Sequence, residues 1–182
     1  ATKCACGHSP VVMISGFGAT VLAEKQEDGS LKRVFPPDTK EILKLLGVNA
    51  PDLITGIIKL IAQKGTDGIE KPMREIITSI VEPLRMNDDG TSFYDIVPIL
   101  SSAKDTSLEA FTKNGQLDLV PYTGSEFLDM EVIGDEIGDD HVFNFLYDWR
   151  LSHADVAAQL HDYLAEVCAL TGHDKVSVYS IS

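Results

Sequence analysis

The sequence has few basic residues for its length. Lysine and arginine together number 15 against 28 aspartates and glutamates, which gives a formal net charge of -13 over 182 residues. A surface of this charge repels phosphate backbones and, over most of its area, anionic lipid head groups. Nucleic acid is therefore not expected as a partner.

Long hydrophobic runs are also missing. No apolar stretch approaches the roughly 20 residues that a membrane-spanning helix needs. The opening ATKCACGHSP lacks the basic-then-apolar pattern of a signal peptide. An opening without an initiator methionine also fits a mature terminus from which such a peptide has been removed. Together with the resemblance described below, this terminus favours a secreted or cell-surface protein, although engineered trimming would give the same appearance.

Cysteine is scarce, with only Cys4, Cys6 and Cys168 in the chain. The first two are one residue apart and the third falls in a helix-like pattern, so no disulfide framework is expected. The stretch from Cys4 to His8 offers at most three soft metal ligands, and no second pair follows in the sequence. We predict no metal site and no cofactor, and we interpret the first residues as a flexible or disulfide-linked terminus.

The first regular pattern in the chain is a buried strand. Residues 10 to 15, PVVMIS, form a short apolar run with β-branched residues, which is typical of a strand covered on both faces of a parallel sheet. Gly16-Phe17-Gly18 follows at once. Two glycines around one apolar residue allow a tight turn whose backbone amides point outward, so this loop is a candidate anion-binding site.

The last third of the chain alternates helices and strands. Ser125 can begin a helix that runs to about Ile137, and residues 142 to 147, VFNFLY, indicate a strand. Ser152 then opens a long amphipathic helix that ends at Gly172, and residues 175 to 180 predict the next strand. Strands separated by helices of this length favour parallel crossovers and a mostly parallel, doubly wound α/β sheet.

The segment from 25 to 124 has a different character. Apolar residues recur at helical spacing over 51 to 64 and 73 to 85, and a shorter helix is predicted at 40 to 46. Asn114-Gly115 is predicted to be the tip of a hairpin. We predict a helical insertion between two parts of a core that spans 8 to 24 and 125 to 182. The insertion helices either form the core of a subdomain or act as a mobile lid that meets acyl chains or a lipid surface.

The chain closes on Ser180-Ile181-Ser182, directly after the last predicted strand. A serine at a sharp turn between a strand and a helix is held with its hydroxyl exposed, which suits a nucleophile. These residues match the first three places of a small-x-Ser-x-Gly elbow, with serine in place of the first glycine. The other interpretation is a strand that happens to finish on serine.

Several segments together carry a family resemblance. VVMISGFGATVL near the start, Tyr147-Asp148-Trp149-Arg150 within FLYDWRLS, and the closing VSVYSIS resemble the lecithin:cholesterol acyltransferase-like family of α/β-hydrolases. That family includes lipases, phospholipases and acyltransferases. The resemblance implies an α/β-hydrolase fold, of which this chain is an N-terminal portion, with a helical cap at 25 to 124.

The resemblance also implies roles for individual residues. Ser182 falls at the position of the nucleophile, and Phe17 at the position whose backbone amide contributes to the oxyanion hole. The acid and the histidine of the triad follow the serine in this fold, so neither is in the chain. The five histidines all precede Ser182 and are interpreted as surface or packing residues. Asp148 and Arg150 are expected to form an ion-paired structural corner with Trp149 packed beneath it, or else to contact substrate.

The expected function is that of a serine lipase, esterase or acyltransferase that acts on lipid esters through an acyl-enzyme. The expected partners are a lipid or ester substrate, a transiently contacted membrane surface, and a second chain that carries the remaining triad residues. The alternative is a non-catalytic α/β binding module in which the elbow serine is inert.

Overall fold

The computed structural model describes residues 7–37, 74, 77–78, 80–119 and 125–180. Several predictions fall outside these residues, namely Ser182, the two cysteines near the start, the helices at 40 to 46 and 51 to 64, and much of the helix at 73 to 85. Of that last helix, the described residues before Glu82 are helical. A single 3-10 turn, η2 (Glu82–Leu84), follows them.

The chain divides into two compact units. The first contains Ala1–Leu22 and Val97–Ser182, and the second contains Ala23–Ile96. The second unit is thus shorter than the insertion that the sequence predicted over 25 to 124, because the described residues 97–119 belong to the first unit. A role for the second unit as a cap stays a prediction.

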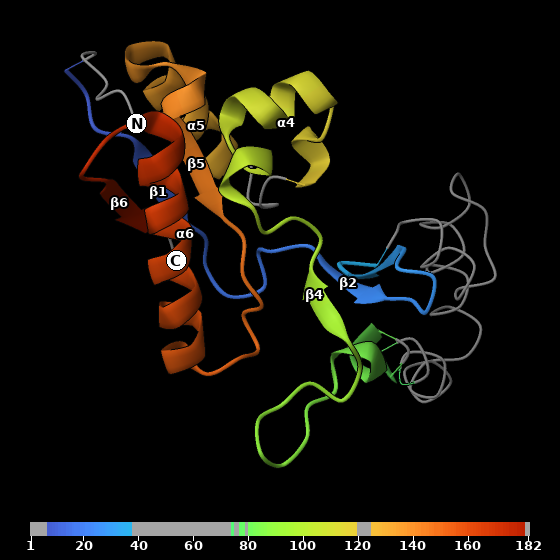
Figure 1. Ribbon diagram of the computed structural model, residues 1–182. Helices are drawn as coiled ribbons and strands as arrows, with labels where there is room; N and C mark the ends of the chain where they lie inside the picture. Colours follow the sequence, from blue (N-terminus) through green and yellow to red (C-terminus); the bar gives the residue numbers. More distant parts are fainter. Residues whose placement is uncertain (1–6, 38–73, 75–76, 79, 120–124, 181–182) are drawn as a thin grey trace, which may run out of the picture. The chain divides into compact units, whose positions relative to one another are not determined.

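A parallel sheet of three strands forms the centre of the first unit. Its order is β5 (Val142–Phe145), β1 (Val11–Ile14) and β6 (Ser177–Ser180), so that β1 lies in the middle and is parallel to both neighbours (Figure 1). The prediction of a mixed α/β architecture with a parallel sheet is confirmed.

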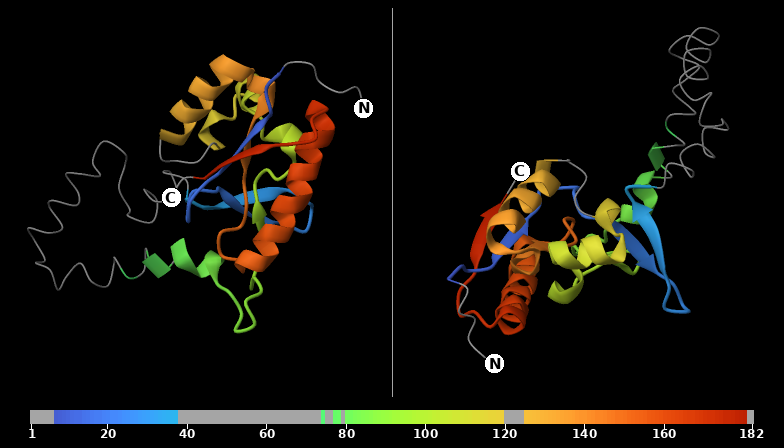
Figure 2. Two further views of the ribbon diagram at one scale, coloured as in Figure 1. Left: turned by 90° about the vertical axis from the view of Figure 1, so that its left-hand side faces the viewer. Right: turned by 90° about the horizontal axis from the view of Figure 1, so that it is seen from above.

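Helices cover both faces of this sheet. Alternate residues of a strand point to opposite faces, and β1 accordingly contributes Val11 and Met13 to one hydrophobic cluster and Val12 and Ile14 to another. The first cluster includes residues of α4 (Leu108–Asn114) and α5 (Ser125–Ile137), and the second includes residues of α6 (His153–Thr171). Figures 1 and 2 show α5 and α6 on opposite sides of the sheet.

The ends of α6 follow the signals in the sequence. Ser152 is its N-cap and its hydroxyl accepts a hydrogen bond from the Asp155 N–H at 3.2 Å. Gly172 ends the helix in the left-handed conformation, with φ of 71°, and its N–H donates to the Cys168 carbonyl at 3.0 Å. A glycine takes this conformation without the strain that a side chain would add.

The hairpin predicted at Asn114-Gly115 is wrong. Gly115 instead ends α4 with φ of 64°, and the Gln116 N–H donates to the Phe111 carbonyl at 2.9 Å. An Asn-Gly pair serves equally well as a hairpin turn and as a helix C-cap. The helix forms here because Ser107 caps its start and because Leu108 and Phe111 are buried in the hydrophobic cluster that includes residues of β1 and β5.

A second sheet has the order β3 (Leu31–Phe35), β2 (Leu22–Lys25) and β4 (Ile96–Pro98). β2 and β3 are joined by a tight turn in which the Gln26 N–H donates to the Ser30 carbonyl at 2.8 Å. Three further 3-10 turns complete the described structure: η3 (Ala103–Asp105), η4 (Leu117–Leu119) and η5 (Asp139–His141).

Candidate functional site at the carboxyl ends of the strands

The three parallel strands end at one edge of the sheet. Ile14 at the end of β1 is opposite Phe145 on β5 and opposite Ser180 on β6. Ligands of open parallel sheets bind beyond this edge. The described segments that emerge here are the Gly16-Phe17-Gly18 loop and the corner from Tyr147 to Arg150, and the last described residue of β6, Ser180, ends at the same edge.

The loop after β1 is a tight turn. The Ala19 N–H donates to the Gly16 carbonyl at 3.3 Å, and Gly18 has φ of 76°. A positive φ at the third of four residues is the requirement of a type II turn, which favours glycine at that position. Phe17 is then the second residue of the turn. Phe17 as a whole residue is 82% exposed.

This turn sets the direction of the Phe17 N–H. The Gly16–Phe17 peptide is planar and trans, so its N–H points away from its carbonyl oxygen. Because the Gly16 oxygen accepts the bond that closes the turn, the Phe17 N–H points away from the turn's interior. No hydrogen bond of the residues described here uses that N–H. It is therefore available as a donor to an anion.

The corner after β5 contains a buried ion pair. The Arg150 Nε donates to Asp148 Oδ1 at 2.9 Å, and its Nη2 donates to Asp148 Oδ2. The Arg150 backbone N–H donates to the same Oδ1 at 3.0 Å, and both side chains are 4% exposed. This confirms the predicted ion pair. Since both charged groups are buried and paired with each other, the geometry favours the predicted structural corner, and a contact with substrate stays the other prediction.

Trp149 does not simply fill space beneath the ion pair. Its ring lies against the ring of Phe17, with the centroids 4.5 Å apart and the planes at 61°. An edge-to-face arrangement of this kind is favourable between aromatic rings. The corner after β5 therefore contacts the turn after β1 directly.

Two hydrogen bonds join the same two segments. The Tyr147 hydroxyl donates to the Ser15 carbonyl at 2.8 Å, and the Tyr147 N–H donates to Thr20 Oγ1 at 3.3 Å. The turn of Gly16 to Ala19 is thus held at both of its ends by one residue of the corner. Burial raises the pKa of Tyr147, so its hydroxyl remains a donor at neutral pH.

A buried asparagine supports this arrangement from within the sheet. Asn144 is fully buried in β5, and its Oδ1 accepts a hydrogen bond from the Ser15 hydroxyl at 3.3 Å. The contributions of Ser15, Thr20, Asn144 and the Tyr147 hydroxyl were not predicted from the sequence. A single amide within the apolar run VFNFLY was the one available signal, because buried polar side chains in strands are normally hydrogen-bonded.

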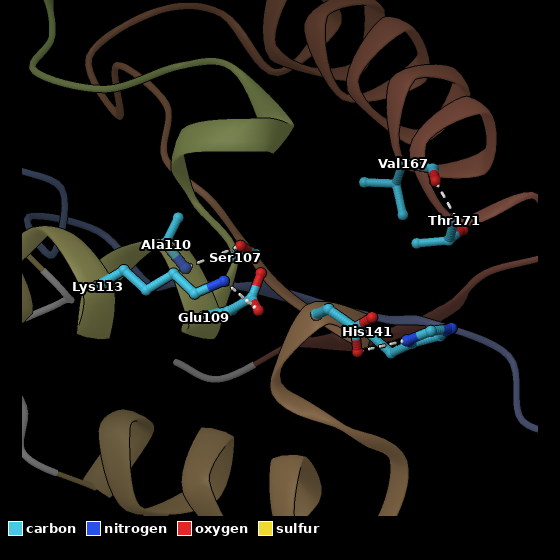
Figure 3. A network of polar contacts seen from close by, with 8 residues as sticks. Ser107, Glu109, Ala110, Lys113, His141, Val167 and Thr171 are labelled. Atoms are coloured by element: carbon cyan, nitrogen blue, oxygen red, sulfur yellow. Dashed lines mark hydrogen bonds and ion pairs between the residues drawn. The ribbon is translucent and has the colours of Figure 1, made fainter.

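A hollow lies at the amino end of β5 and is the main alternative site. It has a volume of about 410 Å³ and is lined by Lys104, Ser107, Glu109, Asp140, His141, Phe143, Leu170 and Thr171. Figure 3 shows its polar groups. His141 Nδ1 is 2.8 Å from Asp140 Oδ1, and Lys113 Nζ pairs with Glu109. The Ser107 hydroxyl accepts from the Ala110 N–H as a helix cap.

The groups around this hollow have structural roles. His141 is buried and its ring lies edge-to-face with that of His173, with centroids 5.4 Å apart. Ser107 is occupied as a cap, and no cluster of three or more metal-ligating side chains was found among the described residues. The hollow also lies at the amino end of β5, away from the edge where parallel sheets bind ligands. The carboxyl edge is therefore the better candidate.

Among the described residues, none of the helices has the length and apolar character needed to cross a bilayer. No family model matches the chain, and the comparisons with curated proteins and with solved structures find no match either. A function for this chain is therefore inferred from its residues and from their geometry at the carboxyl edge of the parallel sheet.

Proposed function

We propose that the chain is part of a serine lipase, esterase or acyltransferase, with Ser182 as the nucleophile and the Phe17 N–H as one oxyanion donor. The observation that carries the proposal is the pairing of β1 with β6 in parallel register. Acyl transfer needs a nucleophile at one strand end and an amide donor from the loop after a neighbouring strand. The adjacency of these two strands supports both requirements.

The proposed reaction proceeds through an acyl-enzyme. The Ser182 hydroxyl oxygen bonds to the carbonyl carbon of an ester while a histidine accepts its proton. The carbonyl oxygen becomes an oxyanion that accepts a hydrogen bond from the Phe17 N–H. The intermediate collapses as the alcohol leaves with the proton, and water or another alcohol then accepts the acyl group.

The remaining triad residues belong, on this proposal, to polypeptide outside the given sequence. The resemblance implies that the acid and the histidine follow Ser182, whether in a continuing segment or in a second chain. The second compact unit, Ala23–Ile96, is the proposed cap that contacts lipid or a membrane surface. A secreted or cell-surface location and an α/β-hydrolase fold are parts of the same proposal.

The nucleophile is tested with a fluorophosphonate probe on the full natural protein. We expect one equivalent of probe at Ser182, and loss of both labelling and p-nitrophenyl ester hydrolysis in Ser182→Ala. Ser180→Ala is the matched control, because it removes a hydroxyl two residues earlier and should retain both. Full activity in Ser182→Ala, or labelling at another serine, would contradict the assignment. A natural protein that neither labels nor hydrolyses esters would favour the binding module.

The oxyanion donor is tested at Phe17 itself. Proline is favoured at the second residue of a type II turn, so Phe17→Pro removes the N–H while it preserves the turn. We expect kcat to fall roughly 100- to 1000-fold, as for the loss of one oxyanion donor. Phe17→Ala keeps the N–H and removes only the exposed ring, so it should retain most of kcat. Equal effects of the two substitutions would exclude the N–H as the donor.

A further inference from the structure

Gly16 lies between two peptide groups that are each held by a hydrogen bond. The preceding peptide is held through its Ser15 carbonyl, which accepts from the Tyr147 hydroxyl at 2.8 Å. The following peptide is held through its Gly16 carbonyl, which accepts from the Ala19 N–H at 3.3 Å. Glycine has the widest backbone freedom of any residue. Without both bonds, rotation about Gly16 would redirect the peptide that contains the Phe17 N–H.

We propose that Tyr147 is a positioning residue, whose hydroxyl fixes the peptide before Gly16 and so aims the Phe17 N–H at the reacting oxygen. The inference rests on the proposed function, and it adds the source of the donor's orientation. It also gives the Tyr-Asp-Trp-Arg segment a specific role, because Tyr147 is its first residue.

Tyr147 is itself firmly held, as a positioning residue must be. Its N–H donates to Thr20 Oγ1 at 3.3 Å, and its ring is stacked on that of Phe145 with centroids 5.5 Å apart and planes at 9°. The next residue, Asp148, is fixed by the buried pair with Arg150. The Tyr147 side chain, which holds the turn, is therefore itself fixed in position by its neighbours. A displacement of about 1 Å at such a site can reduce the rate by roughly 100-fold.

The chain offers a matched control in Tyr163. Its hydroxyl donates to the Asn144 carbonyl at 3.1 Å, so it also bonds a backbone oxygen of the same sheet. Tyr163 belongs to α6, and its hydroxyl contacts Thr106 Oγ1 and the Asn144 carbonyl rather than the turn of Gly16 to Ala19. Tyr147→Phe and Tyr163→Phe therefore each remove a hydroxyl that donates to a backbone oxygen of the sheet, and Tyr163→Phe also removes a contact with Thr106 Oγ1. Only the first substitution releases the peptide before Gly16.

The experiment compares the two substitutions in the full natural protein with a soluble p-nitrophenyl ester. We expect Tyr147→Phe to lower kcat by roughly 10- to 100-fold with KM within twofold of its original value, since the lost interaction acts on the transition state. Tyr163→Phe should lower Tm at least as much as Tyr147→Phe does, because its hydroxyl has two buried partners, and should leave kcat within about twofold of its original value. Equal losses of kcat in the two variants, or an unchanged kcat in Tyr147→Phe, would overturn the proposal.

A second measurement separates this inference from the proposed function. The amide resonance of Phe17 reports the orientation of the turn without any need for catalysis. Trp149, the single tryptophan of the chain, reports its contact with the Phe17 ring through fluorescence. Tyr147→Phe should shift both signals and Tyr163→Phe neither. If Ser182→Ala retains activity while these shifts occur, the proposed function fails and the positioning of the turn stands.

Thr20→Val provides the test if Tyr147→Phe does not fold. It removes the acceptor of the Tyr147 N–H and keeps the shape of the buried side chain, whereas Thr20→Ser keeps the acceptor. We expect Thr20→Val to shift the Phe17 resonance and lower kcat at least threefold relative to Thr20→Ser. Indistinguishable values in this pair would overturn the proposal as well.

Discussion

The two neighbours of β1 are paired in the same way and packed in opposite ways. β5 and β6 each contribute four residues that lie parallel to β1 in continuous register. All four residues of β5 are buried, whereas all four of β6 are exposed, with Val178 at 50% and Tyr179 at 44%. Identical backbone pairing therefore accompanies very different side-chain burial.

This contrast shows that the hydrogen bonds that position a strand and the side-chain burial that stabilises the fold are separate contributions. The hydrogen bonds of a sheet place a strand, but each bond contributes only about 1 kcal/mol net to folding. Burial of a large apolar side chain contributes roughly 1.5 to 3 kcal/mol. Within the described residues, β5 should therefore stabilise the unit and hold the turn after β1, while β6 is positioned by β1 and contributes little stability of its own.

The largest expected effect is at Phe145 in β5. Its ring is buried in the cluster with α6 and contacts the rings of Tyr147 and Tyr163. Phe145→Ala should reduce the free energy of unfolding by about 3 to 5 kcal/mol, since it removes buried surface and leaves a cavity. Urea denaturation measures the change. Tyr179→Ala in β6 is the comparison. An equal loss of unfolding free energy there would show that β5 and β6 contribute equally to stability.

The buried ion pair after β5 should give the next effect. Asp148→Asn leaves the Arg150 guanidinium buried beside a neutral group, which we expect to reduce the free energy of unfolding by about 3 kcal/mol. Replacement of both residues, as Asp148→Asn with Arg150→Met, should recover much of that loss in chemical denaturation. A loss below about 1 kcal/mol for the single substitution would show that solvent reaches the pair.

A smaller effect is expected for Tyr163→Phe. The Tyr163 hydroxyl is buried, lies 2.6 Å from Thr106 Oγ1 and donates to the Asn144 carbonyl. Its loss should reduce the free energy of unfolding by about 1 kcal/mol at neutral pH. Thermal denaturation at pH 7 gives the comparison with the natural protein. No change in Tm would mean that these bonds are replaced by water.

The same residue predicts a dependence on alkaline pH. Burial raises the pKa of Tyr163 in the folded state above the ordinary value of 10.0. The unfolded chain therefore loses this proton first, so stability is complete below pH 10.0 and falls as the pH rises through the folded pKa. The slope should reach about 1.4 kcal/mol per pH unit, and Tyr163→Phe should reduce it. An unchanged slope in the variant would assign the dependence to other groups.

Local patterns predicted the helices and strands of the parallel sheet well. Ser152 and Gly172 marked the ends of α6, and the apolar runs marked β1 and β5, because capping and burial are encoded within a few residues. The same cues misassigned Asn114-Gly115, where a hairpin tip and a helix C-cap look alike. They also gave no indication of β2 and β3, which are short and largely solvent-exposed at their hairpin end.

The candidate site was harder to predict because its contacts are distant in sequence. The Tyr147 hydroxyl and the Ser15 carbonyl are 132 positions apart, and a backbone acceptor leaves no signature in the sequence. The resemblance brought attention to Phe17 and to the Tyr-Asp-Trp-Arg segment. Their direct contact through the Trp149 ring follows only from the pairing of β1 with β5.

The smallest expected change in the free energy of unfolding is at Val178. It gives the most direct test of the difference in burial between β6 and its neighbours. Val178→Thr keeps the β-branched shape at a half-exposed position of β6, so the free energy of unfolding should change by less than about 0.5 kcal/mol. Val12→Thr, at the paired position of β1, is fully buried and should cost more than about 1 kcal/mol, because the hydroxyl has no water there. Both values come from urea denaturation. A loss at Val178 as large as that at Val12 would mean that other polypeptide covers β6 in the natural protein, and the edge next to the proposed nucleophile would then be part of a wider core.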